Sequence, residues 1–173
     1  MNKLFEELQF LRKDLPQELL RELLKNSKRS DRDLAKILKV SQPTITRTRH
    51  KLEKSGIIQD YTVVPNFTQM GFEILAVTLV KMRPEIRTPE VFNEAKKYTE
   101  KFPNAIFAAT GEGLGMTGMI ISFHKNITDY HRKWNQMRID WKEYIIDIQN
   151  FIVSLEEGEI KRFSLTHLKD VPL

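Results

Sequence analysis

Residues 30–56 decide the fold of this chain, and they read SDRDLAKILKVSQPTITRTRHKLEKSG. Ser30 is a favourable helix N-cap, and Asp33 stands three residues later as its capping-box partner. Ser41 provides a second helix start. Gly56 then predicts the end of that second helix. Two short helices joined by a tight turn are typical of a helix-turn-helix.

The second predicted helix has two unlike faces. Ile45, Thr48 and Leu52 recur at helical spacing and predict its buried side. The opposite side is polar and basic, which is what a helix needs in order to enter the major groove of DNA. This pattern therefore predicts double-stranded DNA as the partner.

The outward side chains suggest separate roles in reading DNA. Gln42 can pair bidentately with adenine, and Arg47 with guanine. Thr44 and Thr46 can touch a base edge, a thymine methyl or a phosphate. Ser41, as the cap, directs the first N–H groups of the helix at a phosphate.

Other cationic or polar side chains predict contacts with the DNA backbone, which position a protein without reading sequence. These are Lys28, Arg29, His50 and Lys51. Arg49 falls near the buried edge of the helix. It either joins these contacts or covers the core with its aliphatic stem.

The charge is concentrated around the same stretch. Residues 25–54 carry ten Lys or Arg against three Asp or Glu, which amounts to +7. The whole chain carries +5, so the remaining residues sum to −2. A basic segment on a nearly neutral body is typical of proteins that bind phosphate groups.

The composition excludes several other kinds of protein. The 173 residues include no cysteine, which excludes disulfides and thiol nucleophiles and fits a cytoplasmic location. No apolar run reaches the roughly 18–20 residues of a membrane span, and the charged N-terminus is unlike a signal peptide. The four histidines lack metal-ligand spacing. We expect no metal, no cofactor and no enzymatic activity.

The flanks extend the helix-turn-helix into a domain of residues 1–64. Residues 3–12 predict a short extra helix, and a further helix begins near Pro16. Residues 57–64 are β-branched and aromatic, and they predict a strand that forms a wing. Tyr61 in this wing would either flank the minor groove or pair within the ribbon.

Residues 65–71 predict a hinge, and residues 72–173 a second domain. The pattern in this domain predicts strands at 72–82, 104–110, 117–123, 148–155 and 159–168, and helices at 90–102 and 127–144. A β-α-β-β-α-β order with one extra strand is the ferredoxin-like arrangement. The predicted fold class is therefore α+β, a winged helix-turn-helix followed by a ferredoxin-like domain.

The first strand of this second domain is apolar on both faces. Ile74 and Ala76 alternate with Leu75 and Val77, which is typical of a strand covered on both sides. Two helices cover only one face of such a sheet, so we expect the sheet of a partner subunit on the other. A monomer with an exposed apolar sheet is the alternative.

Several short motifs carry a resemblance to a known family. They are Asp33-Leu34-Ala35, Val40-Ser41, Thr44-Ile45-Thr46-Arg47, Lys51-Leu52-Glu53, Gly56-Ile57-Ile58, Tyr61-Thr62 and Met70-Gly71-Phe72. Through them the chain, from about Leu15 to Leu168, resembles the Lrp/AsnC family of leucine-responsive, feast/famine transcription regulators. The resemblance implies homodimers that assemble further into tetramers or octamers, and an amino-acid effector bound between subunits.

The resemblance also implies an effector site at the turn between the second and third strands of the second domain. That turn consists of Gly111, Glu112, Gly113, Leu114 and Gly115. Its N–H groups suit a carboxylate. The Asp of the family's Gly-x-x-Asp pattern is missing, so Glu112 is the acid left to hold an α-amino group.

These observations predict a sequence-specific transcription regulator that binds roughly palindromic sites, with half-sites about 34 Å apart. One alternative is an architectural DNA-binding protein of low specificity. Another is an enzyme like the sirohaem decarboxylases, which resemble this family in fold and use a degenerate helix-turn-helix. The strongly basic second helix argues against the enzyme.

Overall fold

The computed structural model describes residues 3–86 and 88–171, with side chains from residue 14 onward except at residue 86. The chain divides into two compact units. One unit combines Met1–Val64 with Phe163–Leu173, and the other is Pro65–Arg162. The expected second domain of residues 72–173 thus differs at its C-terminal end, which joins the N-terminal unit.

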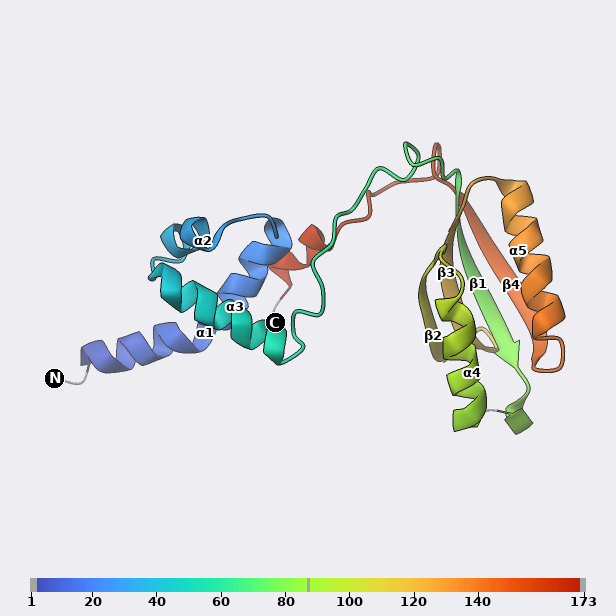
Figure 1. Ribbon diagram of the computed structural model, residues 1–173, viewed down its shortest axis with the longest axis horizontal. Coiled ribbons are helices and arrows are strands. Elements are labelled where there is room, and N and C mark those ends of the chain that lie inside the picture. Colours follow the sequence, from blue (N-terminus) through green and yellow to red (C-terminus); the bar gives the residue numbers. More distant parts are fainter. Residues whose placement is uncertain (1–2, 87, 172–173) are drawn as a thin grey trace. The chain divides into compact units, whose positions relative to one another are not determined.

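The N-terminal unit is built from three helices and a 3-10 turn (Figure 1). They are α1 (Lys3–Lys25), α2 (Asp31–Ile37), α3 (Gln42–Lys54) and η2 (Leu165–Asp170). The core consists of Leu15, Leu19, Leu23, Leu34, Ala35, Ile45 and Leu52. Burial of these side chains is the main force that holds short helices of this kind together.

Both predicted helix starts of the helix-turn-helix are confirmed. The Ser30 hydroxyl accepts from the Asp33 N–H at the start of α2. The Ser41 hydroxyl accepts from the Thr44 N–H at the start of α3. Gly56 follows α3 with a φ of 75°, a conformation that a residue with a Cβ rarely adopts.

Two predictions in this unit were wrong. The helix at 3–12 and the helix starting near Pro16 are one continuous helix, since a proline removes a single hydrogen bond and α1 runs through it. Residues 57–64 contain no strand. The described residues of this unit contain no strand with which residues 57–64 could pair. Residues 57–64 therefore lack the backbone hydrogen bonds to a neighbouring strand that a wing strand needs.

The ferredoxin-like arrangement of the second unit is confirmed. In chain order it contains β1 (Ile74–Met82), η1 (Pro84–Ile86), α4 (Pro89–Glu100), β2 (Ala105–Gly113), β3 (Met116–His124), α5 (Ile127–Asp140) and β4 (Ile145–Ser154). The four strands lie in the order β2-β3-β1-β4, and every neighbouring pair is antiparallel.

The strand register separates the two faces of this sheet. Thr78 of β1 pairs with Ile120, and both line a hollow that α4 and α5 cover. The neighbouring residue Val77 pairs with Ile121 and Phe151 and therefore points to the opposite face. On that face Phe151 is 69% exposed. The described residues leave much of this apolar face open.

The predicted last strand at 159–168 was wrong. β4 ends the sheet at Ser154, and a 3-10 turn begins at Leu165. The Ser164 side chain accepts from the Thr166 N–H and so starts that turn. The Thr166 hydroxyl donates to the Leu24 carbonyl at 3.2 Å, which attaches the tail to α1.

Candidate nucleic-acid interface

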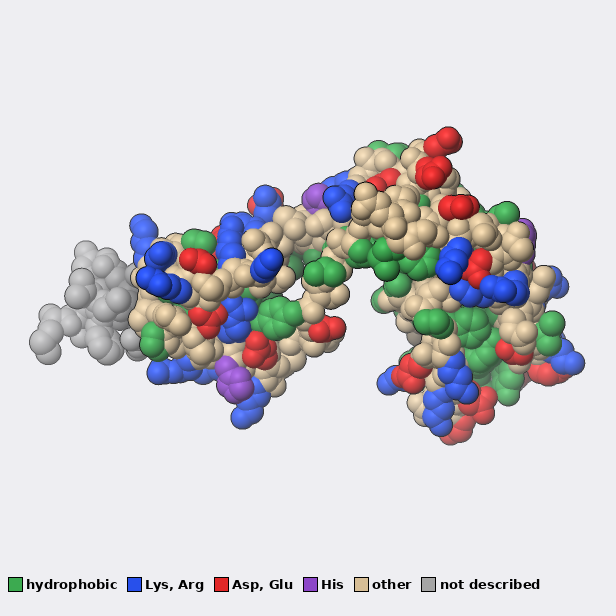
Figure 2. Space-filling view, turned by 45° about the horizontal axis from the view of Figure 1, so that its top comes forward, with side chains coloured by type: hydrophobic (Ala, Val, Ile, Leu, Met, Phe, Trp, Pro, Cys, Tyr) green, Lys and Arg blue, Asp and Glu red, His purple; other side chains and the backbone are tan. Residues whose placement is uncertain are grey.

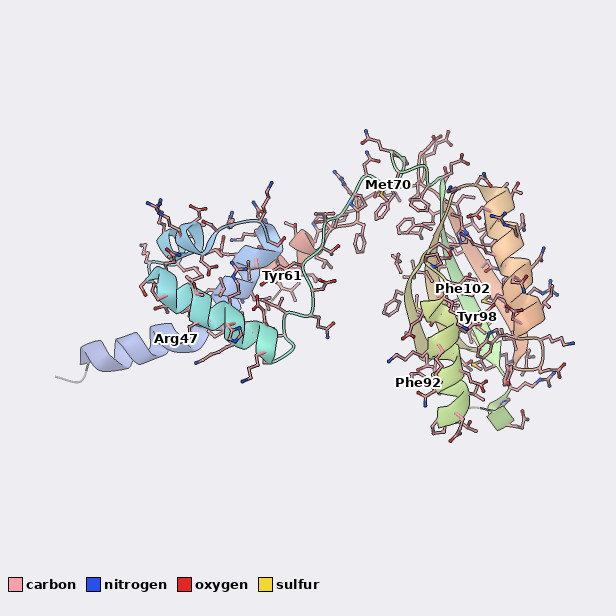
Figure 3. The ribbon with its side chains drawn as sticks, in the orientation of Figure 1. Arg47, Tyr61, Met70, Phe92, Tyr98 and Phe102 are labelled. Carbon is pink, nitrogen blue, oxygen red and sulfur yellow. The ribbon has the colours of Figure 1, made fainter. Side chains whose placement is uncertain are left out.

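Burial on one side of α3 sets which side chains face outward. Ile45 is 0% exposed and Leu52 is 4% exposed, so the helix is held against α1 and α2 by that side. The remaining surface of the helix carries exposed side chains, among them Gln42, Thr46, Arg47, His50 and Lys51. The first four of these line one shallow hollow together with Pro43. The exposed Arg47 lies on α3 (Figure 3). Of the predicted base-reading residues, Gln42, Thr46 and Arg47 share this surface, whereas Thr44 is half-buried and does not line the hollow.

The start of α3 is rigidly capped. The Ser41 Oγ lies 3.3 Å from the Thr44 N–H and 2.8 Å from the Thr44 hydroxyl. These two predicted contact residues therefore bind each other at the helix N-terminus. The arrangement fixes the first turn of α3, where the helix dipole favours an anion.

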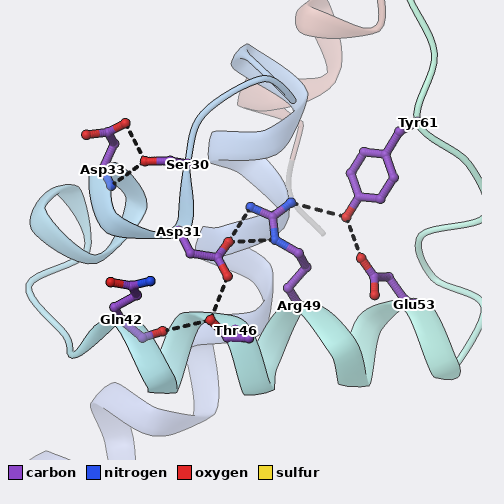
Figure 4. Close-up of polar contacts among 8 residues, drawn as sticks. All are labelled: Ser30, Asp31, Asp33, Gln42, Thr46, Arg49, Glu53 and Tyr61. Atoms are coloured by element: carbon purple, nitrogen blue, oxygen red, sulfur yellow. Dashed lines mark hydrogen bonds and ion pairs between the residues drawn. The ribbon is translucent and has the colours of Figure 1, made fainter.

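An acidic side chain from α2 braces the middle of α3 (Figure 4). The Thr46 hydroxyl donates to Asp31 Oδ2 at 2.6 Å. Arg49 Nε donates to Asp31 Oδ1 at 2.8 Å, and Arg49 Nη2 lies 2.7 Å from the same oxygen. Burial raises the pKa of Asp31, but these hydrogen bonds and the guanidinium charge outweigh it and hold the pKa below its ordinary value. Asp31 therefore remains a carboxylate that joins the two helices.

The brace continues into the segment after α3. Arg49 Nη1 donates to the Tyr61 hydroxyl at 3.2 Å, and that hydroxyl donates to Glu53 Oε1 at 2.8 Å (Figure 4). The guanidinium carbon also lies 5.9 Å from the centre of the Tyr61 ring, within the range of a cation–π contact. Arg49 and Tyr61 thus serve the domain's own packing.

The predicted backbone contacts lie in differing surroundings. Lys28 is exposed in the loop after α1. Arg29 forms an ion pair with Glu22 of α1. His50 is exposed and its Nδ1 lies 3.8 Å from Glu53 Oε2. Figure 2 shows Lys and Arg side chains over the surface of this unit, as its basic sequence predicts.

Sequence reasoning missed Asp31 as an organising residue. It contacts Thr46 and Arg49, which lie 15 and 18 residues further along the chain. An acid in the first turn of a helix is ordinarily explained by the helix dipole alone. Its tertiary role therefore has no local signal.

The predicted effector residues lie in the other unit, at the tip of the β2–β3 hairpin. Leu114 and Gly115 form the turn, with φ of 52° and 72°. Two successive positive φ values are the mark of a type I′ turn, which matches the twist of antiparallel strands. The five residues 111–115 are all exposed.

Within the part of the chain that the structure describes, no group of three or more His, Asp and Glu side chains is arranged to hold a metal ion. None of the described helices has the length and apolar character to cross a membrane.

The fold defines a protein of the helix-turn-helix class. Its N-terminal unit is a helix-turn-helix with a basic outer face, and the chain continues into a ferredoxin-like unit. Residues 12–59 match the family model for a winged helix-turn-helix DNA-binding domain. The chain is 30% identical over 95 residues to the HTH-type transcriptional regulator LrpA of Pyrococcus abyssi, a match that covers 54% of this chain and 64% of that protein.

Solved structures show the same fold. A regulator of the AsnC family from Agrobacterium tumefaciens matches with a TM-score of 0.73 and 18% identity, over 86% of this chain and 92% of that one. A Neisseria meningitidis transcriptional regulator, solved as a complex with L-Met, matches with a TM-score of 0.71 and 17% identity, over 89% of this chain and 97% of that one.

The chain is thus similar in sequence to an HTH-type regulator named LrpA and in fold to a regulator of the AsnC family. It spans 64–65% of the length of the first curated relatives that it matches.

Proposed function

We propose that the chain is a sequence-specific transcription regulator that reads the major groove of DNA with α3. The observation that carries this proposal is the exposed, basic face of a helix whose other face is fully buried. A helix of this kind in a helix-turn-helix presents its outer side chains to base edges. The exposed Gln42 and Arg47 have the donor and acceptor groups that adenine and guanine recognise.

The contacts within the unit refine the roles of the other residues. The hydroxyl of Thr46 is occupied by Asp31, so Thr46 offers DNA its methyl group and a lone pair. Ser41 and Thr44 present the start of α3 to a phosphate. Lys28, Arg29, His50 and Lys51 contribute positive charge or hydrogen bonds to the DNA backbone, with Arg29 doing so from its pair with Glu22.

The open face of the sheet supports a homodimer. Val77, Ile121 and Phe151 form part of an apolar surface that the described residues leave uncovered. Packing two such faces together would remove them from water, and a two-fold axis would present two α3 helices to a palindromic site. Further assembly into tetramers or octamers and a cytoplasmic location complete the proposal.

An amino-acid effector at the hairpin tip also belongs to this proposal. The Neisseria meningitidis relative was solved with L-Met. Here the backbone of residues 111–115 would receive a carboxylate and Glu112 the α-amino group. Titration with single amino acids, read by calorimetry on the wild type and Glu112→Gln, tests this site. Equal binding by the two proteins would contradict the role of Glu112.

The function is tested by selecting bound sites from a randomised DNA pool. Arg47→Ala should weaken binding to the selected site by about 1–3 kcal/mol and relax the preference at one base position. Lys51→Ala is the control for a phosphate contact. It should weaken all sequences alike and reduce the salt slope of binding by about one unit.

Two results would overturn parts of the proposal. Equal binding of the pool by the wild type and Arg47→Ala would remove the base-reading role. A specificity ratio near one against random DNA would identify an architectural binder instead of a regulator.

A further inference from the structure

A carboxylate of α2 lies beside an exposed side chain of α3. The Thr46 hydroxyl oxygen lies 2.6 Å from Asp31 Oδ2 and 3.2 Å from the Gln42 carbonyl oxygen (Figure 4). A carboxylate and a carbonyl accept hydrogen bonds and cannot donate them. A hydroxyl has a single proton. The proton of Thr46 is therefore committed to the protein, and none is left for a base.

Asp31 is held in place for this contact from its other side. Arg49 bonds Oδ1 of the same carboxylate, through Nε at 2.8 Å and Nη2 at 2.7 Å. The side chain of Asp31 is 21% exposed and that of Arg49 is 17% exposed, so the ion pair is largely withdrawn from water. The guanidinium keeps the carboxylate charged and leaves Oδ2 for α3. The Thr46 proton therefore has a fixed acceptor within the domain.

The rest of the Thr46 side chain is its methyl group. Thr46 is exposed and lines the shallow hollow on α3 beside Gln42 and Arg47. The hydroxyl and the methyl are attached to one Cβ, so a hydroxyl fixed on Asp31 also fixes the direction of the methyl. A threonine can ordinarily both donate and accept. Here it offers a ligand only a methyl group and an oxygen lone pair.

The bases of DNA differ in what they present to such a side chain. In the major groove guanine presents only acceptors, its N7 and O6 atoms. A hydroxyl without an available proton cannot pair with either of them. Thymine presents a methyl group, which packs against the methyl of a threonine, while adenine and cytosine present an amino group to the lone pair. Thr46 is therefore best suited to thymine and least suited to guanine.

We propose that Asp31 is a specificity-determining residue of the DNA site, which acts through Thr46 to favour thymine and reject guanine at the base that Thr46 faces. Asp31 is a positioning residue in this role, since it touches Thr46 and not the base. The inference rests on the proposed function, because it requires α3 to enter the major groove. It adds a base preference that Gln42 and Arg47 do not determine.

The thymine contact is tested without changing the protein. A site that the full chain selects from a randomised DNA pool is synthesised again with deoxyuridine in place of thymidine, at one position at a time. Deoxyuridine lacks only the methyl group and keeps every base-pairing atom. We expect one thymine in each half-site at which this change weakens binding about fourfold, the worth of one buried methyl group.

Two substitutions separate the methyl of Thr46 from its hydroxyl. Thr46→Ser keeps the hydroxyl for Asp31 and removes the methyl, so the penalty for deoxyuridine at that position should disappear. Thr46→Val keeps a methyl and removes the hydroxyl, so the penalty should remain and guanine should still be rejected. A Thr46 that merely stabilised the domain would leave the deoxyuridine penalty unchanged in both variants.

Removal of Asp31 should release the proton. In Asp31→Ala the Thr46 hydroxyl keeps only its longer contact with Gln42 and can donate to guanine. Binding to a site with guanine at that position should improve roughly tenfold relative to the thymine site, the worth of one hydrogen bond. The double variant Asp31→Ala, Thr46→Val has no such proton and should reject guanine again, which separates proton release from a shift of α3.

Asp33→Ala is the matched control, because it removes the same charge from α2 at a residue that bonds Ser30 instead. It should keep the wild-type base preference. Thermal melts show whether Asp31→Ala is folded, since it loses the ion pair with Arg49. Equal rejection of guanine by the wild type and Thr46→Val tests the committed proton even without that variant.

Failure of this inference is distinguishable from failure of the proposed function. A wild-type chain that selects no site from the pool refutes the proposed function and this inference with it. A chain that selects a site without any thymine sensitive to deoxyuridine, or with a penalty that survives in Thr46→Ser, refutes the inference alone. So does a folded Asp31→Ala that rejects guanine as the wild type does.

Discussion

Two arginines of α3, only two positions apart, have opposite surroundings. Arg47 is exposed, whereas the side chain of Arg49 is 17% exposed and ion-paired with Asp31. Helical geometry explains the difference, since residues two apart point to different sides of a helix. Arg47 is accessible to DNA, whereas the guanidinium of Arg49 is occupied by contacts within the domain.

The brace around Arg49 predicts a stability effect. Arg49→Ala removes the hydrogen bonds to Asp31 and Tyr61 and leaves a partly buried carboxylate without its counter-charge. The free energy of unfolding should fall by about 1–3 kcal/mol. Arg47→Ala should change it by less than about 0.5 kcal/mol. Urea denaturation measures both, and equal stability of the two variants would contradict the brace.

His124 predicts a dependence of stability on pH. Burial, together with the positive charge of Lys133, lowers its pKa from the ordinary 6.5, and the nearby Asp129 only partly opposes this. The folded protein therefore holds His124 neutral, while the unfolded chain takes up a proton below about 6.5. Stability contributed by the neutral ring is complete above that pH and is lost as the pH falls toward the folded pKa.

The measurement is a series of thermal melts between pH 7.5 and 5. The melting temperature of the wild type should fall more steeply with acidification than that of His124→Gln. His131→Gln, at an exposed histidine of α5, should follow the wild type. Buried carboxylates such as Asp129, whose pKa lies below the ordinary 3.8, change the stability of the protein only at lower pH. Parallel curves for the wild type and His124→Gln would exclude the effect.

Among the elements, the β2–β3 hairpin departs from local backbone preference at its turn. Its type I′ turn places Leu114 at a φ of 52° with 84% of the residue exposed. A residue with a Cβ pays roughly 1–2 kcal/mol in that conformation, and asparagine tolerates it better. The exposed leucine gains no burial in return.

Leu114→Asn should therefore raise the free energy of unfolding by about 0.5–1 kcal/mol, because Asn-Gly is the preferred pair for this turn. Leu114→Ala keeps the unfavourable conformation and serves as the control. Thermal melts of the three proteins measure the difference. If alanine stabilised the protein as much as asparagine, the backbone explanation would be wrong.

Elements with strong local signals were predictable, and those that depend on a partner strand were not. The caps at Ser30 and Ser41 have hydrogen-bond partners three residues away, which the sequence displays. A strand needs a neighbour that the sequence does not specify. Residues 57–64 are rich in β-formers and residues 159–168 were also predicted as a strand, yet neither segment forms one.

For the whole molecule, the open apolar sheet face predicts an assembly that can be disrupted. Phe151→Glu places a charge on that face, where the residue is 69% exposed and the fold of a single chain should tolerate it. We expect the dimer to dissociate, as measured by sedimentation equilibrium, and binding to a palindromic site to weaken because two helices no longer act together.

The control is Ile139→Glu, which places the same charge on α5 at a residue 64% exposed. It should leave the assembly and DNA binding unchanged. A wild-type chain that sediments as a monomer, or a Phe151→Glu variant that assembles as the wild type does, would contradict the proposed interface.

The amino-acid sequence by itself determined the helix-turn-helix with its exposed basic face and the β-α-β-β-α-β pattern of the second unit. These features rest on interactions between residues a few positions apart, which periodicity and capping residues reveal. The tertiary structure alone decided that Asp31 forms an ion pair with Arg49 and that the C-terminal turn attaches to α1 through Thr166. Those contacts join residues far apart in the chain, and no local pattern encodes which distant partner a side chain will meet.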